Sequence, residues 1–255
     1  MTFFLLLVSG LFLAIWAVNI AGAFFLALPV LEFLLPLVGY AQLMALFKVG
    51  SLGWGISGGY ATRKQVNWQQ IRHVAPALLT GSIAGVFLIN QITRDVIPFV
   101  VVGAIFFIEL IIPAVSRFDL PKNRTLLIVA AFLIGIYGSS ISAGFGLLTL
   151  ALFRLAYPGG DSIAQASIQA RVCEFLCVIV TVFVHLLYGN ILYFYAVALF
   201  SGTLIGGLIG GKLLVRLTSV PAKTQRFFLY GVYGFALVTT FQQPLSKILA
   251  GFLNL

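Results

Sequence analysis

Long stretches of apolar residues, separated by short polar or proline-containing gaps, cover most of the chain. The runs are about 2–35, 41–61, 71–93, 96–116, 125–156, 162–188, 191–217 and 223–242. About 20 apolar residues form a helix that crosses a membrane, so six of these runs each predict one crossing. The first and fifth runs, of 34 and 32 residues, are too long for one crossing and short for two. We expect each of them to form a broken or re-entrant helical hairpin.

The middle of the fifth run is rich in small residues. From Gly135 to Gly146, eight of twelve residues are Gly, Ser or Ala. A helix broken at membrane depth frees backbone N–H and C=O groups that lipid cannot satisfy, so the break must face protein or a water-filled cavity. Paired breaks in corresponding segments of a transporter point to a substrate site near the midplane. The candidate residues at the two breaks are Asn19 and Gly22, then Ser139, Ser140, Ser142 and Gly144.

Close helix packing is the alternative explanation for such small residues, because they allow membrane helices to approach each other. For the run GTLIGGLIGG at 202–211 we prefer this packing interpretation. For 135–146 we prefer a break, because the length of the run and the charge distribution both require one.

The two halves of the chain, 1–120 and 121–255, repeat the same order of elements. The segment 67–85 aligns with 192–210 at an offset of 125, which pairs Gly81 with Gly206. Ten of the fifteen Lys and Arg residues fall in three clusters, which the positive-inside rule places in the cytoplasm. This puts Lys64 inside and its repeat partner Gly189 outside. The predicted fold class is therefore an all-α integral membrane protein with two inverted-topology repeats, each a broken hairpin followed by three transmembrane helices.

Composition agrees with a lipid environment. Hydrophobic residues make up 61% of the chain, charged residues 8%, and the mean hydropathy is +1.12, whereas soluble domains carry about 25% charged residues. The net charge of +9 is explained by cytoplasmic loops near anionic lipids, so we expect membrane lipids and no nucleic acid as partners. Two histidines in separate segments exclude a His-rich metal centre, and no HExxH or GxSxG motif occurs. We expect no enzyme activity, cofactor or metal.

Two cationic residues inside apolar runs are candidates for an anion site. Lys48 and Arg171 are costly to place in lipid, at about 2.5–3.5 kcal/mol each, and positive charge near half-helix ends favours anions. Glu174 lies three residues after Arg171 and can pair with it on one helix face, so Arg171 is equally explained by ligand contact or by that pair. Gln42 and Gln169 are further candidate hydrogen-bonding residues.

The remaining ionisable residues are weaker candidates. Glu32 and Glu109 lie near run ends and are explained either as interfacial residues or as carriers of a coupling proton. His185 is close to the outer boundary, which favours an interfacial position. Cys173 and Cys177 share a helix face and are best interpreted as small apolar packing residues.

Several segments resemble the sulfite exporter TauE/SafE family. YGNILYFYAVALFSGTLIGGLIGGKLLVRL looks like that family's second-half ending, and the turn QVNW at 65–68 is similar to the corresponding turn in its first half. The triple-Gly cluster that many members carry after the first break is absent from NIAGAFFLALP and SAGFGLLTLAL. The resemblance implies a permease that moves sulfite or small organosulfonates out of a bacterial cell without an ATPase domain of its own.

The predicted function is therefore a multi-pass transporter in the bacterial plasma membrane. It would export sulfite or organosulfonates such as sulfoacetate as a secondary carrier, by alternating access. The alternatives are a permease for another small anion or for a cation, and a membrane assembly protein. Oligomeric state, the coupling ion and the direction of net transport do not follow from the sequence.

Overall fold

The fold is taken from a computed structural model that describes residues 1–19, 23–91, 99, 102–103, 106, 124–142, 144–157 and 163–217. The runs 96–116 and 223–242 fall almost entirely outside these residues, as do Gly22 and Glu109. Within the described part the chain is helical and has no strand. This agrees with the predicted all-α membrane protein.

Four α-helices and one short 3₁₀ helix make up the described part of the first half, and four α-helices that of the second. The first half contains α1 (Thr2–Asn19), α2 (Ala23–Leu34), α3 (Tyr40–Thr62), η1 (Arg63–Gln65) and α4 (Trp68–Ile89). The second contains α7 (Arg124–Ser140), α8 (Phe145–Ala156), α9 (Ile163–Leu187) and α10 (Tyr193–Leu217).

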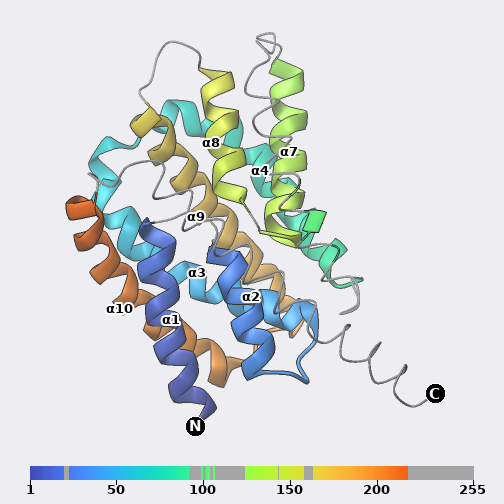
Figure 1. The fold of residues 1–255 in the computed structure, drawn as a ribbon. Helices are drawn as coiled ribbons and strands as arrows, with labels where there is room; N and C mark the ends of the chain where they lie inside the picture. The colour runs from blue at the N-terminus through green and yellow to red at the C-terminus, as the bar shows by residue number, and fades with distance from the viewer. Residues whose placement is uncertain are drawn as a thin grey trace.

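Both long apolar runs form two helices, as predicted. The first run divides into α1 and α2, of 18 and 12 residues, and the fifth into α7 and α8, of 17 and 12 residues. Figure 1 shows the α1–α2 pair in the lower half of the bundle and the α7–α8 pair in the upper half. Each pair is too short to cross a bilayer twice, since 12 residues of helix span only about 18 Å.

Contacts between helix ends define the two ends of the bundle. The N–H of Asn67, before α4, donates to Oε1 of Gln169 near the start of α9 at 3.1 Å. At the opposite end, Nδ2 of Asn190 donates to Oδ1 of Asn90 at 2.8 Å, which joins the ends of α9 and α4. We call the first of these the basic end, because Arg63, Lys64 and Arg72 lie within five positions of Asn67. Arg154 belongs to the same end, since Tyr157, three residues later, donates its hydroxyl hydrogen to the carbonyl of Gln70.

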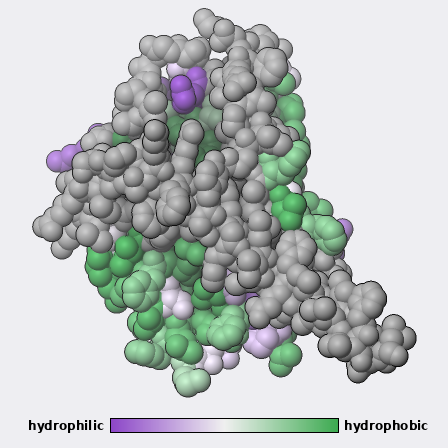
Figure 2. Space-filling model, in the orientation of Figure 1, coloured by the Kyte–Doolittle hydropathy of each residue, from purple (hydrophilic) through white to green (hydrophobic). Residues whose placement is uncertain are grey.

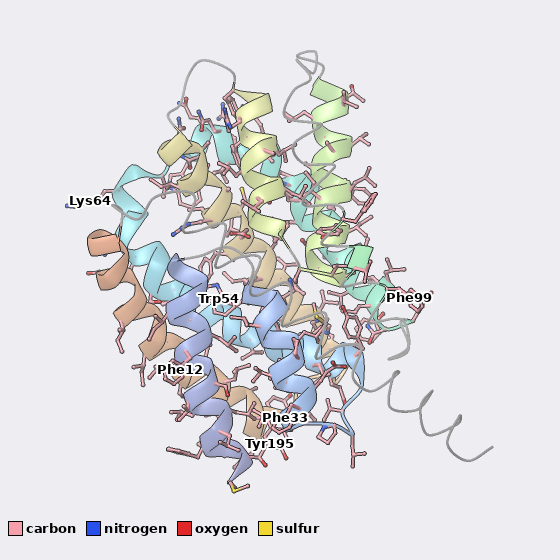
Figure 3. All side chains as sticks on the ribbon, in the orientation of Figure 1. Phe12, Phe33, Trp54, Lys64, Phe99 and Tyr195 are labelled. Carbon is pink, nitrogen blue, oxygen red and sulfur yellow. The ribbon has the colours of Figure 1, made fainter. Side chains whose placement is uncertain are left out.

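Helices α1 and α7 start at opposite ends. The Phe3 and Phe194 rings, 4.9 Å apart, place the start of α1 beside the start of α10, away from the basic end. Helix α7 runs parallel to α4 from the basic end. Figure 3 shows Lys64 projecting from the bundle at this end.

Glycines bring the most extensively packed helix pairs, α1–α10 and α4–α7, into close contact. A Cβ at Gly81 would overlap the carbonyl of Phe132, and one at Gly206 would overlap the carbonyl of Leu11. A Cβ at Gly202 would likewise overlap the carbonyl of Leu7. The packing interpretation of the 202–211 glycines is thus confirmed for Gly202 and Gly206.

Two apolar clusters fill the interior. One joins the α1–α2 pair to α3 and α10, and the other joins the α7–α8 pair to α4 and the first part of α9. Cys173 and Cys177 are buried in the second cluster, which confirms their interpretation as packing residues. Many large apolar side chains face outward, including Phe12 and Phe33 (Figure 3), and the described part of the face in Figure 2 is mostly hydrophobic.

Three helices in the described part are long and apolar enough to cross a membrane. They are Trp68–Ile89, Ile168–Leu187 and Tyr193–Gly210. Helix α3, with 23 residues, spans about 35 Å and therefore also has sufficient length. Its middle carries the charged residue Lys48.

Candidate functional site

The break between α7 and α8 redirects backbone hydrogen bonds. The N–H groups of Ile141 and Ser142 both donate to the carbonyl of Tyr137, at 2.8 and 3.2 Å. In a continuous α-helix the Ser142 N–H would bond to Gly138, so the carbonyl of Gly138 loses its helical partner. Ser142 and Gly144 then adopt left-handed φ angles of 64° and 69°, which turn the chain into α8.

Helix α3 supplies donors to the carbonyls at this break. Nζ of Lys48 donates to the carbonyl of Gly138 at 2.6 Å, and the hydroxyl of Tyr40 donates to the carbonyl of Ser140 at 3.2 Å. Both side chains are 2% exposed. The carbonyl of Gly138 also accepts from Oγ of Ser142 at 2.8 Å. The break predicted from the sequence therefore packs against protein, and a lysine holds it.

The other two serines near the break are also hydrogen-bonded. Oγ of Ser140 donates to the carbonyl of Ile136 at 2.7 Å. The hydroxyls of Ser139 and Thr181 lie 3.2 Å apart, which links α7 to α9. A ligand at these serines would therefore have to replace bonds that already exist.

Glu174 lies against the first turn of α8. A Cβ at Gly146 would lie 2.7 Å from Oε1 of Glu174, so the missing side chain leaves room for this carboxylate. The N-cap residue of α8 is Gly144, which has no side chain to cap the helix. The first N–H groups of a helix have no helical partner and carry partial positive charge. The carboxylate thus occupies a position where an anion is favoured.

Lys48 lies close to the same place. Its Nζ is 5.9 Å from the centre of the Phe145 ring, at the start of α8. Glu174 interacts electrostatically with Arg171 and with Lys48. The start of α8, one buried cation and one carboxylate therefore meet at the α7–α8 break.

The remaining predicted residues differ in their positions. Arg171 is exposed, one turn before Glu174 on α9. Gln169 is fully buried, and its Nε2 has no hydrogen-bond partner within the described part of the chain. Gln42 accepts from the N–H of Gly39 at 3.3 Å and so caps α3.

The break between α1 and α2 lies partly outside the described residues. Asn19 is the last residue of α1, and its side chain is not among those described. Gly22 and Glu109 lie outside the described residues. Glu32 is half-buried on α2 and interacts electrostatically with Tyr40.

Two buried polar residues near the site were not predicted. Tyr40 lies two turns before Lys48 on α3, a spacing that would have placed its hydroxyl near the same helices. His185 was expected near the membrane interface; it lies beside Asn190 at the end of α9, and its side chain is fully buried within the protein, which was not predicted. Spacing also gives a signal here, because the following α9 residues recur every four positions and are all buried: Gln169, Cys173, Cys177, Thr181 and His185.

The described residues include no group of three His, Cys, Asp or Glu side chains placed to hold a metal ion. The polar groups at the break are instead hydroxyl donors, the ammonium of Lys48 and the carboxylate of Glu174.

Comparison with protein families matches residues 5–240 to the sulfite exporter TauE/SafE family. The chain belongs to that family. A comparison with curated proteins gives no match, and a comparison with solved structures gives none. TauE/SafE membership, with the apolar helices described above, identifies a membrane transporter and confirms the resemblance read from the sequence. The expectation that the protein has no enzyme activity is consistent with this transporter family.

Proposed function

We propose that this TauE/SafE protein exports sulfite or a small organosulfonate across the bacterial plasma membrane. The observation that carries the proposal is the meeting of Lys48, the start of α8 and Glu174 at a helix break inside the bundle. A compact anion with several oxygens loses water at membrane depth and needs positive charge and donors in exchange. The ammonium of Lys48 and the N–H groups of α8 offer both.

Glu174 occupies the place of the substrate in this proposal. Its carboxylate lies at the first turn of α8 and is attracted by Lys48. A sulfonate or sulfite that enters would compete with it for the same positive groups. Arg171, exposed one turn away, can attract either the displaced carboxylate or the entering anion through its planar guanidinium.

We also propose that the two halves are inverted repeats that work by alternating access. Equivalent helices have similar lengths, such as α3 with 23 residues and α9 with 25. Exchanging the halves converts the contact of α1 with α10 into that of α7 with α4, and the contact of α3 with α10 into that of α9 with α4. The opposite starting ends of α1 and α7 support the same proposal, since an inverted repeat requires them.

Counterflow tests this function. Proteoliposomes that contain the full chain are loaded with unlabelled sulfite, sulfate, taurine or sulfoacetate, and uptake of labelled sulfite is followed. We expect acceleration by sulfite and by at least one sulfonate, and little uptake with Lys48→Met. Absence of counterflow with every anion, together with transport of a cation in the same vesicles, would contradict the proposal and favour the alternative of a cation permease.

A further inference from the structure

His185 has a buried ring nitrogen without a partner. The side chain is 0% exposed, and Nε2 makes no hydrogen bond to any residue that the structure describes. Buried polar groups in proteins are nearly always hydrogen-bonded, because an unpaired one loses its water and gains nothing in return. The retention of such a group near the end of α9 therefore needs an explanation.

The neighbours of His185 determine which nitrogen carries the proton. Nδ2 of Asn190 lies 2.8 Å from Oδ1 of Asn90 and 3.3 Å from Nδ1 of His185. Because an amide Nδ2 only donates, Nδ1 of His185 accepts its second hydrogen. The imidazole is then neutral, with its proton on Nε2. The unpartnered Nε2 is thus an N–H donor without an acceptor in the described part of the chain.

His185 lies between the proposed anion site and the outer end of the bundle. Asn90 and Asn190 are at the end opposite the basic end, which the positive-inside rule assigns to the outside. His185 lies eleven positions after Glu174 on α9, about 17 Å along the helix. Lys48 and His185 are near enough to interact electrostatically. The buried polar residue Thr181 lies between the two levels.

We propose that the Nε2–H of His185 is the outward donor of the export path, which bonds to an oxygen of the anion after it leaves Lys48 and before it is released. This inference rests on the proposed function, since it assumes an anionic substrate. A neutral donor suits such a step. Transport along such a path requires that each site binds the anion tightly enough to receive it and weakly enough to release it.

Three substitutions separate this role from simple packing. In His185→Gln the amide nitrogen takes the place of Nε2 and keeps the donor. In His185→Asn the amide reaches only the position of Nδ1. In His185→Phe the ring shape remains and the donor is lost. Each variant is compared with wild type for sulfite counterflow, for sulfite affinity in detergent by calorimetry, and for thermal stability.

We expect His185→Phe and His185→Asn to slow counterflow at least tenfold, with sulfite affinity within twofold of wild type. His185→Gln should keep at least half of the wild-type rate. His185→Phe should be about as stable as wild type, because removal of the unpaired donor offsets the lost hydrogen bond from Asn190. If it does not fold, the pair of Gln and Asn variants decides alone.

Equal rates for the Gln and Asn variants, or a wild-type rate for His185→Phe, would overturn the inference while leaving sulfite export intact. Failure of the wild-type protein itself to exchange any anion would instead overturn the proposed function, and this inference with it.

Discussion

In the inverted repeat proposed above, helices α3 and α9 are equivalent, yet their buried polar residues differ. They have 23 and 25 residues and pack against each other. The buried charge of α3 is Lys48, which reaches the break in the other half. Helix α9 instead buries polar residues over four turns, from Gln169 to His185. The offset of 125 pairs Lys48 with Cys173, an apolar packing residue.

If the proposed repeat holds, its two halves share a backbone arrangement and differ in their chemistry. The glycine contacts that fix the helices occur in both halves, at Gly81 and at Gly206. The groups that suit an anion do not, because α3 gives the cation while α8 and α9 give the helix start and the carboxylate. In the described part of the chain, the proposed repeat therefore carries an asymmetric candidate site.

The largest expected effect tests the inverted repeat itself, by determining which side of the membrane two repeat partners face. With Cys173 and Cys177 replaced by Ala, single cysteines at Lys64 and Gly189 are treated with an impermeant thiol reagent outside cells. We expect labelling of position 189 and none of position 64, because inverted halves place these repeat partners on opposite sides. Lysed cells, in which both should react, serve as the control. Labelling of position 64 alone would refute the inverted repeat.

The next effect is on stability. Gly81→Ala and Gly206→Ala each place a Cβ against a backbone carbonyl, and overpacking of this kind costs about 1–3 kcal/mol. Gly59→Ala is the matched control, since a Cβ there meets nothing within 4 Å. Thermal unfolding in detergent should show similar losses for Gly81→Ala and Gly206→Ala and none for Gly59→Ala. A loss in one half only would mean that the two packed pairs are not equivalent.

Substitutions at equivalent positions of α3 and α9 should affect anion affinity differently. Lys48→Met removes the buried ammonium, so we expect sulfite binding to weaken at least tenfold, or about 1.4 kcal/mol. Cys173→Ala changes the repeat-equivalent position and should leave the affinity within twofold. Both are measured by calorimetry on folded protein. If Lys48→Met leaves the sulfite affinity unchanged, the role of this lysine would be limited to its hydrogen bond with the carbonyl of Gly138.

The smallest effect concerns Glu174. Glu174→Gln removes a negative charge that competes for the start of α8, so sulfite should bind a few-fold more tightly. Glu174→Asp keeps the charge and is the control. If Glu174 instead holds the helices together through Arg171, the Gln variant would lose thermal stability and gain no affinity.

The broken runs could be predicted because their signals are local. A run of 32 residues cannot form one crossing, and the small residues near Ser139 mark where its helix ends. Close packing at Gly206 followed from spacing alone. Both predictions depend on residues near each other in the chain, which a sequence shows directly.

The contacts of the site could not be predicted, because they join distant segments. The carbonyl that accepts from Lys48 belongs to Gly138, ninety positions later. Nothing in the run 162–188 shows that Arg171 faces outward while Gln169, two residues earlier, is buried. His185 looked interfacial from its distance to the run end, but the loop residue Asn190 folds beside its ring. Such faces are set by neighbouring helices.

The shared carbonyl of Gly138 has a mechanical consequence. Two donors hold it, Nζ of Lys48 and Oγ of Ser142, and one of them is the cation that an arriving anion attracts. When Lys48 turns toward substrate, the corner between α7 and α8 loses a tether that crosses to the other half. Under the proposed alternating-access mechanism, substrate binding and release of this tether would then be one event, so the empty carrier would be more rigid than the loaded one.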